Sequence, residues 1–186
     1  MLEYMAWYAV QVHTRREKQI EVVLLEKGYD VFLPTYVCKT HSRSEFEAPL
    51  FPGYLFCRIV SPHCGKIITT GGVVQILRVG GVPARIDSLE IERIKRIVTS
   101  PVVRMPWRYL PAGCRVRIAS GPLEGMEGLI ENDNNGPKLV VSVNILCRSV
   151  AAALDPSTVI VPLFRKTVPL ATTDEQRLAQ RLASGA

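Results

Sequence analysis

The sequence contains few of the residues that build metal or catalytic centres. It has three histidines and five cysteines in 186 residues, and none of these lies at the spacing of a zinc site. The odd number of cysteines, without a C-x-x-C pair, gives no disulfide framework either. We therefore predict that the protein holds no metal and no cofactor.

Signatures of the common enzyme classes are also missing. The sequence contains no G-x-S-x-G, H-E-x-x-H, phosphate-loop or dinucleotide-binding motif. Cys57 and Cys64 remain candidate nucleophiles, although a buried structural thiol is the commoner role of a lone cysteine. We predict that the protein is not an enzyme, and we keep a cysteine nucleophile as an alternative.

Long apolar runs and a secretion leader are absent as well. No run of about 18 apolar residues occurs, and the N-terminus lacks a basic segment followed by an apolar core. The sequence predicts a cytoplasmic protein that does not bind membranes. Its formal charge of +6 permits contact with nucleic acid, and it is equally compatible with an ordinary solvated surface.

The first hundred residues alternate between strand-like and helix-like segments. Trp7 to His13 is rich in aromatic and β-branched residues and predicts a strand. A helix over about 15–27 follows, and Thr14 and Glu17 have the spacing of a capping box. Asp87 is placed to cap a last helix that ends before Pro101.

Further strands are predicted at 30–38, 50–60 and 73–79, with a short helix at 63–70 and a loop or hairpin tip from Lys39 to Glu47. The resulting order is β-α-β-β-α-β-α. This order predicts an α+β unit in which helices pack on a small antiparallel sheet.

A linker and a second domain are predicted after residue 101. The segment 102–112 contains Pro106 and Pro111 and no clear periodicity, which is typical of a semi-rigid linker. Short strands are then expected at 114–119, 127–132, 138–145, 148–154 and 158–161, which is enough for a five-stranded all-β barrel. The predicted domains are residues 1–101 and 113–163, followed by a polar tail at 164–186.

A turn motif with spaced glycines lies between the first two strands of the predicted barrel. It consists of Gly121, Pro122, Gly125 and Gly128. Glycines between strands permit tight turns and close backbone approach. We interpret the motif as structural, since nothing in it points to a ligand.

The segment from Phe51 to Phe56 carries aromatic residues on both sides of a Pro52-Gly53 bend. Side chains alternate between the two faces of a strand, so a single sheet cannot bury both sets under its own helices. Aromatic rings of this segment that stay exposed at the surface predict a protein partner. The alternative is that Phe51, Tyr54 and Phe56 belong to the core, which is the commoner fate of such residues.

Together these segments resemble NusG-type transcription elongation factors over roughly residues 6–162. The resemblance rests on Trp7-Tyr8, on 28–34 (GYDVFLP), on 51–56 (FPGYLF), on the glycine motif within 113–130 and on 141–148 (VSVNILCR). It implies an N-terminal NGN-like domain that binds RNA polymerase, and a C-terminal barrel of the KOW type, which is SH3-like. It also implies a cytoplasmic monomer.

The resemblance assigns roles to several groups of residues. Contact with the clamp of RNA polymerase is implied for Tyr8, Phe51, Pro52, Tyr54 and Phe56. Contact with the opposite lobe of the polymerase is implied for Thr69 and Thr70. Contact with non-template DNA is implied for His13, Arg15, Arg16 and Lys18, and nascent RNA is a further candidate partner. The alternative for these four residues is a solvated helix face. Leu146 falls where relatives meet a ribosomal protein or a termination factor, and its alternative is a barrel core residue.

The implied function is that of an elongation or antitermination factor that suppresses pausing or termination. The region around 39–54 looks more like the specialised paralogs of the RfaH and UpxY kind than like the general factor. Strand-favouring residues throughout the barrel, such as Val141 and Val150, argue against refolding into helices. A protein that binds RNA or the ribosome through its KOW barrel, without acting on polymerase, is the alternative function.

Overall fold

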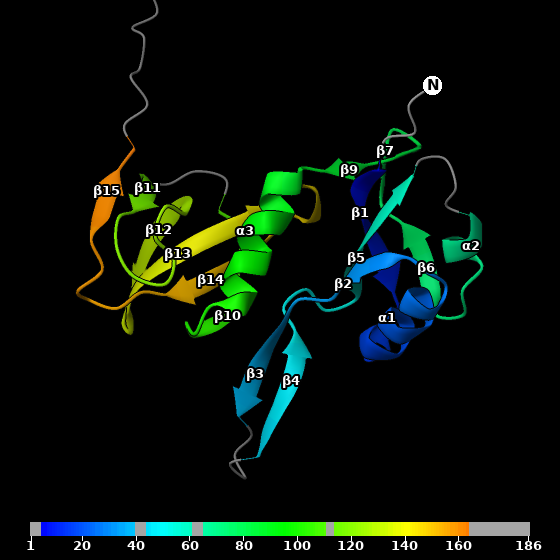
Figure 1. Cartoon of the computed structure of the whole chain (residues 1–186), viewed down its shortest axis with the longest axis horizontal. Coiled ribbons are helices and arrows are strands. Elements are labelled where there is room, and N and C mark those ends of the chain that lie inside the picture. Colours follow the sequence, from blue (N-terminus) through cyan, green and yellow to red (C-terminus); the bar gives the residue numbers. More distant parts are fainter. Residues whose placement is uncertain (1–4, 40–43, 61–64, 111–113, 164–186) are drawn as a thin grey trace, which may run out of the picture.

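The computed structural model describes residues 5–39, 44–60, 65–110 and 114–163. They form two sheet-based units with a long helix, α3, between them (Figure 1). The first unit consists of β1 (Met5–Val12), α1 (Glu17–Glu26), β2 (Asp30–Phe32), β3 (Thr35–Lys39), β4 (Glu45–Pro49), β5 (Tyr54–Val60), α2 (Gly65–Ile68), β6 (Val73–Ile76), β7 (Arg78–Val79), β8 (Val82–Pro83), β9 (Arg85–Ile86) and α3 (Ser88–Thr99). The second consists of β10 (Arg104–Trp107), β11 (Cys114–Ile118), β12 (Glu127–Asp133), β13 (Gly136–Val143), the 3-10 turn η1 (Asn144–Leu146), β14 (Arg148–Ala153) and β15 (Ile160–Pro162).

The sheet of the first unit has the antiparallel order β2-β5-β1-β6, and β9 also pairs with β1. Its two faces have different cores because side chains alternate along β1 and β5. Tyr8, Val10 and Leu55 belong to a core that also contains Ile20 and Leu24 of α1. The opposite face supplies a second cluster, which extends beyond the first unit. The α+β class predicted from the sequence is confirmed.

Helix α1 begins differently from the prediction. Arg16 is its N-cap residue and makes no capping hydrogen bond through its side chain, so the predicted capping box of Thr14 and Glu17 is wrong. The Glu17 carboxylate instead accepts a hydrogen bond of 2.8 Å from the backbone N–H of Gly53, and Glu17 is buried. A tertiary contact has replaced the local one.

Helix α3 agrees with the prediction at its start. The Asp87 carboxylate accepts a hydrogen bond of 2.9 Å from the backbone N–H of Leu89. Three isoleucines, Ile91, Ile94 and Ile97, are buried along one side of the helix. Helix α3 lies between the two units (Figure 1), and its three isoleucines belong to a cluster with residues of both units.

The segment predicted as one strand at 30–38 is divided into β2 and β3 around the buried Pro34. Strand β3 pairs with β4 rather than with the main sheet, from Thr35 opposite Pro49 to Lys39 opposite Glu45. This hairpin projects from the body of the first unit (Figure 1).

All five predicted barrel strands are present in the second unit, and a sixth joins them. The sheet order is β10-β14-β13-β12-β11-β15. Strand β10 comes from the segment predicted to be a linker. The prediction that this segment contains no strand is therefore wrong. It pairs with β14 from Arg104 opposite Ala152 to Trp107 opposite Ser149. Pro106 is compatible with this position because β10 is an edge strand. The predicted tail at 164–186 lies outside the described residues.

The glycine motif has the structural role expected of it. Gly121 and Gly125 have φ angles of 90° and 78°, a region that side chains other than glycine rarely adopt. A Cβ at Gly128 would lie 2.8 Å from the Val140 carbonyl oxygen and 2.9 Å from Leu139 Cδ1. Close packing of β12 against β13 thus requires glycine at position 128.

Candidate functional site

The bent segment before β5 places two phenylalanine rings side by side. The rings of Phe51 and Phe56 pack edge to face, with centroids 5.5 Å apart. Gly53 has a φ of 81° at the bend, and its N–H is held by the buried Glu17. Its carbonyl accepts a hydrogen bond of 2.9 Å from the N–H of Val12. The bend is therefore fixed by α1 and β1, and the rings are held in a defined orientation.

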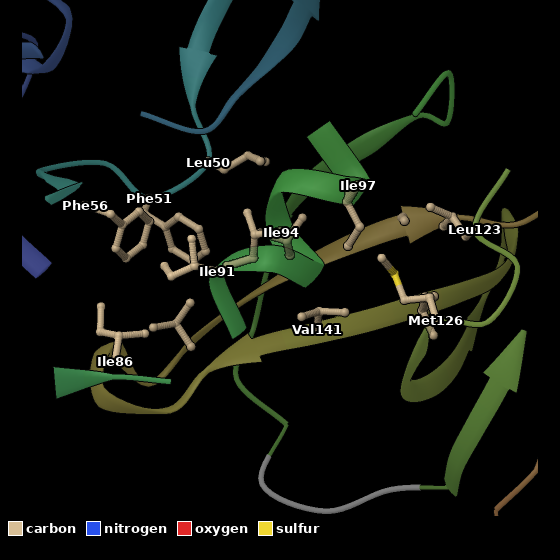
Figure 2. Close-up of a cluster of buried hydrophobic side chains, with 14 of the residues drawn as sticks. Leu50, Phe51, Phe56, Ile86, Ile91, Ile94, Ile97, Leu123, Met126 and Val141 are labelled. Carbon is tan, nitrogen blue, oxygen red and sulfur yellow. The ribbon is translucent and has the colours of Figure 1, made fainter. Parts of the chain in front are cut away.

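The prediction that these rings are exposed is wrong. Phe51 and Phe56 are both 0% exposed, and Tyr54 is half-buried. They belong to one cluster that continues through α3 into the second unit, as Figure 2 shows. We call Phe51, Phe56, Ile91, Ile94 and Ile97 the apolar face of the first unit.

The second unit contributes to the buried cluster that contains the apolar face. Its contributions to the same buried cluster are Val116, Ile118, Leu123, Met126, Leu139, Val141, Val143, Val150, Ala152 and Leu154. In Figure 2, Met126 and Leu123 lie on the side of α3 where Ile97 is drawn, and Val141 lies on β13. Helix α3 also makes its contacts with the second sheet mainly through β13. Elements far apart in the sequence thus build one core.

Tyr8 does not lie with the other predicted clamp-binding residues. It is 1% exposed and belongs to the core beneath α1, on the opposite face of the sheet from Trp7 and Phe56. The alternation of side chains along β1 causes this separation. The structure therefore groups Phe51 and Phe56, places the exposed Pro52 and half-buried Tyr54 beside them, and removes Tyr8 from the group.

Polar contacts join the two units around the edge of the shared core. The Asn144 side chain donates to Glu90 Oε1 at 2.5 Å. Arg148 Nη1 donates to the Pro52 carbonyl at 2.9 Å, and its guanidinium lies 5.2 Å from the centroid of the Tyr54 ring. These contacts place the turn between β13 and β14 against the bend that carries Phe51.

Two further side chains cross between the units. Arg96 of α3 donates to the Glu124 carbonyl, and Arg104 Nε donates to the Thr35 carbonyl at 2.9 Å. Burial is the main cause that raises the pKa of Glu90 above its ordinary value of 4.5. The hydrogen bond from the Asn144 backbone lowers this pKa, and the charge of Asp87 raises it.

Leu146 lies in η1, within the turn that touches the first unit. It is half-buried and packs against the shared cluster together with Ile145. Its neighbours in sequence, Asn144 and Arg148, make the polar contacts to the first unit. The residue predicted to meet a partner is thus half covered by the chain itself.

The four predicted DNA-contacting residues surround the start of α1, and all are exposed: His13, Arg15, Arg16 and Lys18. Lys18 forms an ion pair of 3.1 Å with Glu47 of the projecting hairpin. An exposed pair of this kind contributes little to stability. The structure brings the basic residues together at the start of α1 and leaves their side chains at the surface.

The two predicted opposite-lobe threonines differ in exposure. Thr69 is exposed, and its hydroxyl donates to the Gly65 carbonyl at 3.1 Å. Thr70 is 5% exposed, accepts a hydrogen bond of 2.6 Å from Lys27 Nζ and donates to the Lys66 carbonyl at 2.9 Å. The hydroxyl of Thr70 is therefore engaged within the first unit.

The described residues offer little for catalysis. Burial raises the pKa of the Cys57 thiol to about 12, and the nearby charge of Asp30 adds to the shift, which disfavours the nucleophilic thiolate. Cys64 lies outside the described residues. Over the described ranges, no group of three or more His, Cys, Asp or Glu side chains is arranged to hold a metal ion. Within the same ranges, no helix has the length and hydropathy needed to cross a membrane.

Sequence reasoning misses the residues that join the units. In the sequence, Glu90 is only part of a helix start, and Arg148 is only part of a motif. Glu90 contacts Asn144, which is 54 positions away in the chain, and Arg148 contacts Pro52, which is 96 positions away. Both contacts therefore depend on the tertiary fold. The sequence does contain one signal of a contact between the units, which is the apolar stripe of Ile91, Ile94 and Ile97. One small sheet does not require so long a stripe.

The family model and two sequence relatives agree on one family. Residues 5–95 match the protein family described as "Transcription termination factor nusG". A "Transcription termination/antitermination protein NusG" from Borreliella burgdorferi is 29% identical over 175 residues, covering 81% of this chain and 95% of the relative. The protein of the same name from Deinococcus radiodurans is 26% identical over 188 aligned positions, covering 82% and 97%. A solved structure described as "Domain interaction in Thermotoga maritima NusG" is similar with a TM-score of 0.49 and 21% identity, covering 86% of this chain and 93% of the other.

Proposed function

Because this chain belongs to the NusG family of transcription factors, we propose that it binds RNA polymerase through its first unit and suppresses pausing or termination. Members of this family bind RNA polymerase. The second unit recruits a ribosomal protein or a termination factor. The proposed domains are residues 1–101 and 113–163, and residues 102–112, part of which forms β10, connect them.

The apolar face is the observation that carries the proposal. It combines two aromatic rings, one from the bend before β5 and one from β5, with three isoleucines of α3, and all five side chains are 0% exposed. Buried aromatic anchors supply most of the binding energy in protein interfaces. The Glu17–Gly53 hydrogen bond fixes the bend that presents Phe51, so less ordering is needed on binding. Pro52 and Tyr54 extend this surface toward solvent.

The exposed basic loop supports a second contact. His13, Arg15 and Arg16 lie before α1 with Lys18 in its first turn, and we propose that they touch DNA or RNA beside the polymerase. Contacts of this type attract phosphate without reading sequence. Thr69 is the proposed contact to the opposite lobe, because Thr70 is buried and bonded internally.

An elongation assay tests the proposal. Purified RNA polymerase from the source organism is followed through pause sites and terminators with and without the full chain. We expect shorter pauses or more read-through, and we expect Tyr54→Ala to weaken binding because the half-buried ring lies at the edge of the apolar face. Arg78→Ala is the control, since its guanidinium donates within its own hairpin, to the Gly81 carbonyl. Unchanged pausing, together with failure of polymerase to retain the chain, contradicts the proposal.

The range of target genes is a separate question. We propose a specialised factor rather than the general one, on the strength of the resemblance in 39–54. Mapping the protein along the genome during growth tests this. Occupancy on a few long gene clusters supports the specialised role, and uniform occupancy on all transcribed genes contradicts it.

A further inference from the structure

We propose that one face of the β3–β4 hairpin is a further contact surface for RNA polymerase, and that it meets the protein of the enzyme rather than its nucleic acid. Four residues make up this surface, which we call the hairpin face: Tyr36, Cys38, Phe46 and Ala48. The proposal rests on the proposed function above. It adds a contact outside the residues that the resemblance assigns to polymerase binding.

The register of the hairpin places these four residues on one side. Tyr36 lies opposite Ala48, and Cys38 lies opposite Phe46. Directly opposite residues of an antiparallel pair point to the same side, and successive residues of a strand alternate. The hairpin face is therefore an apolar surface that continues across both strands.

The other side of the hairpin is directed toward helix α1. It carries Val37 and Glu47, which are paired across the two strands. Glu47 forms the exposed ion pair of 3.1 Å with Lys18 of α1. The hairpin face consequently points away from α1. Among the described residues, β3 and β4 pair only with each other.

The hairpin face is partly open to solvent. The Phe46 side chain is 50% exposed, and Tyr36, Cys38 and Ala48 are half-buried. A two-stranded hairpin on its own is marginally stable in water and gains stability when its apolar face is packed against another surface. Because this hairpin projects from the body of the first unit (Figure 1), its contiguous apolar residues are suited to a partner.

Contacts at the base of the hairpin hold it in place. The Leu50 N–H donates to the Pro34 carbonyl at 2.8 Å, and both residues are buried. Arg104 Nε donates to the Thr35 carbonyl at 2.9 Å. The hairpin face is thus presented in a defined direction, which lowers the ordering cost of binding.

Continuity with the bend before β5 points to polymerase as the partner. Strand β4 ends at Pro49, and Phe51 follows two residues later. Tyr36 packs against the buried cluster that contains Phe51. A protein that contacts the exposed Pro52 and the half-buried Tyr54 therefore has the hairpin face next to it.

Charge disfavours nucleic acid as the occupant of the hairpin face. Residues 35–49 contain two basic residues, Lys39 and Arg43, and two acidic ones, Glu45 and Glu47. Their formal charges cancel, whereas the whole chain carries +6. Surfaces that bind nucleic acid have an excess of cations that neutralise phosphates. An apolar face without net charge instead fits the apolar centre of a protein interface.

Phe46→Ala in the full chain tests the proposal, and Val37→Ala is the matched control. Their side chains are 50% and 53% exposed on opposite faces of the same hairpin. Affinity is measured for RNA polymerase without nucleic acid and for an elongation complex on a DNA–RNA scaffold. We expect Phe46→Ala to weaken both complexes about tenfold, and Val37→Ala to match the wild type. Phe46→Leu should lose less than about threefold, because it keeps most of the apolar area.

Labelling of the wild-type chain is a second measurement that needs no variant. Cys38 lies on the hairpin face opposite Phe46, and the exposed Cys114 in the second unit serves as the reference. Iodoacetamide followed by peptide mass spectrometry should show slower modification of Cys38 when polymerase is bound. Hydrogen exchange at 35–39 and 45–49 shows whether the hairpin of Phe46→Ala is still paired. If it is not, the labelling result decides the test.

The outcomes distinguish this proposal from the proposed function. If Tyr54→Ala weakens binding and Phe46→Ala does not, the hairpin contact is wrong while the proposed function stands. A loss from Phe46→Ala that occurs only with the elongation complex identifies nucleic acid as the occupant and overturns the proposal. Unchanged labelling of Cys38 in the complex, or an equal loss from Val37→Ala, overturns it as well. If the wild type fails to bind polymerase, both proposals are wrong.

Discussion

Glu17 provides the sharpest test of how the Phe51 bend is held. Its buried carboxylate accepts a hydrogen bond of 2.8 Å from Gly53 N–H, and Gly53 is itself buried. Glu17→Ala removes a charged acceptor and leaves a buried donor without a partner, which costs about 2 to 3 kcal/mol. Glu17→Gln retains an acceptor, so we expect it to cost roughly half as much, because a bond to a neutral group is weaker.

The capping-box prediction assigns the N-cap of α1 to Thr14, so Thr14→Ala is the control for Glu17→Ala. A functioning cap at Thr14 would make Thr14→Ala cost about 1 kcal/mol. In the structure Thr14 lies outside α1, whose N-cap is Arg16, and its side chain is exposed. We therefore expect Thr14→Ala to stay within about 0.5 kcal/mol of the wild type.

Urea unfolding of the full chain and its three variants, followed by circular dichroism, gives these free energies. Polymerase affinity of the same variants shows whether the bend also matters for binding. A Glu17→Ala variant as stable as the wild type refutes the reasoning. So does a Thr14→Ala variant that loses as much stability as Glu17→Ala, since the local cap would then be the dominant contact.

Three further predictions concern the second unit, Glu90 and the cysteines. Gly128→Ala should cost about 1 to 3 kcal/mol in urea unfolding, because its Cβ would lie 2.8 Å from the Val140 carbonyl oxygen; a cost near zero contradicts the close approach of β12 to β13. The pKa of Glu90 is raised in the folded chain, so the stabilisation that this group contributes is fully present below the ordinary value of 4.5 and is lost as pH rises through the raised pKa. In urea unfolding, the stability of Glu90→Gln relative to the wild type should therefore be higher at about pH 7 than at about pH 4.5; an equal difference at the two pH values excludes Glu90 as its source. Iodoacetamide at about pH 8 should label the exposed Cys147 and spare Cys57, whose pKa is raised to about 12, as peptide mass spectrometry can establish; rapid labelling of Cys57 in the folded chain revives the nucleophile alternative.

Local patterns in the sequence determined most of the secondary structure. Alternation predicted β1 and β5, the Asp87 signal predicted the start of α3, and the glycine motif predicted the turn before β12. These features depend on neighbours within a few residues, where side-chain period and capping chemistry act directly. The family resemblance depended on the same local motifs, and the match over 5–95 confirmed it.

Contacts between distant segments were decided only by the tertiary structure. Glu17 has the spacing of a capping box, yet its carboxylate binds Gly53 because the fold brings a buried N–H within reach. Residues 104–107 resemble a linker in composition, yet they become a strand because β14 offers an unpaired edge. Phe51 and Phe56 have the pattern of an exposed interface, and they are buried in a cluster to which α3 and the second unit supply apolar side chains from distant positions in the chain. Sequence patterns reveal that a side chain is apolar, but which surface removes it from water depends on how the whole chain packs.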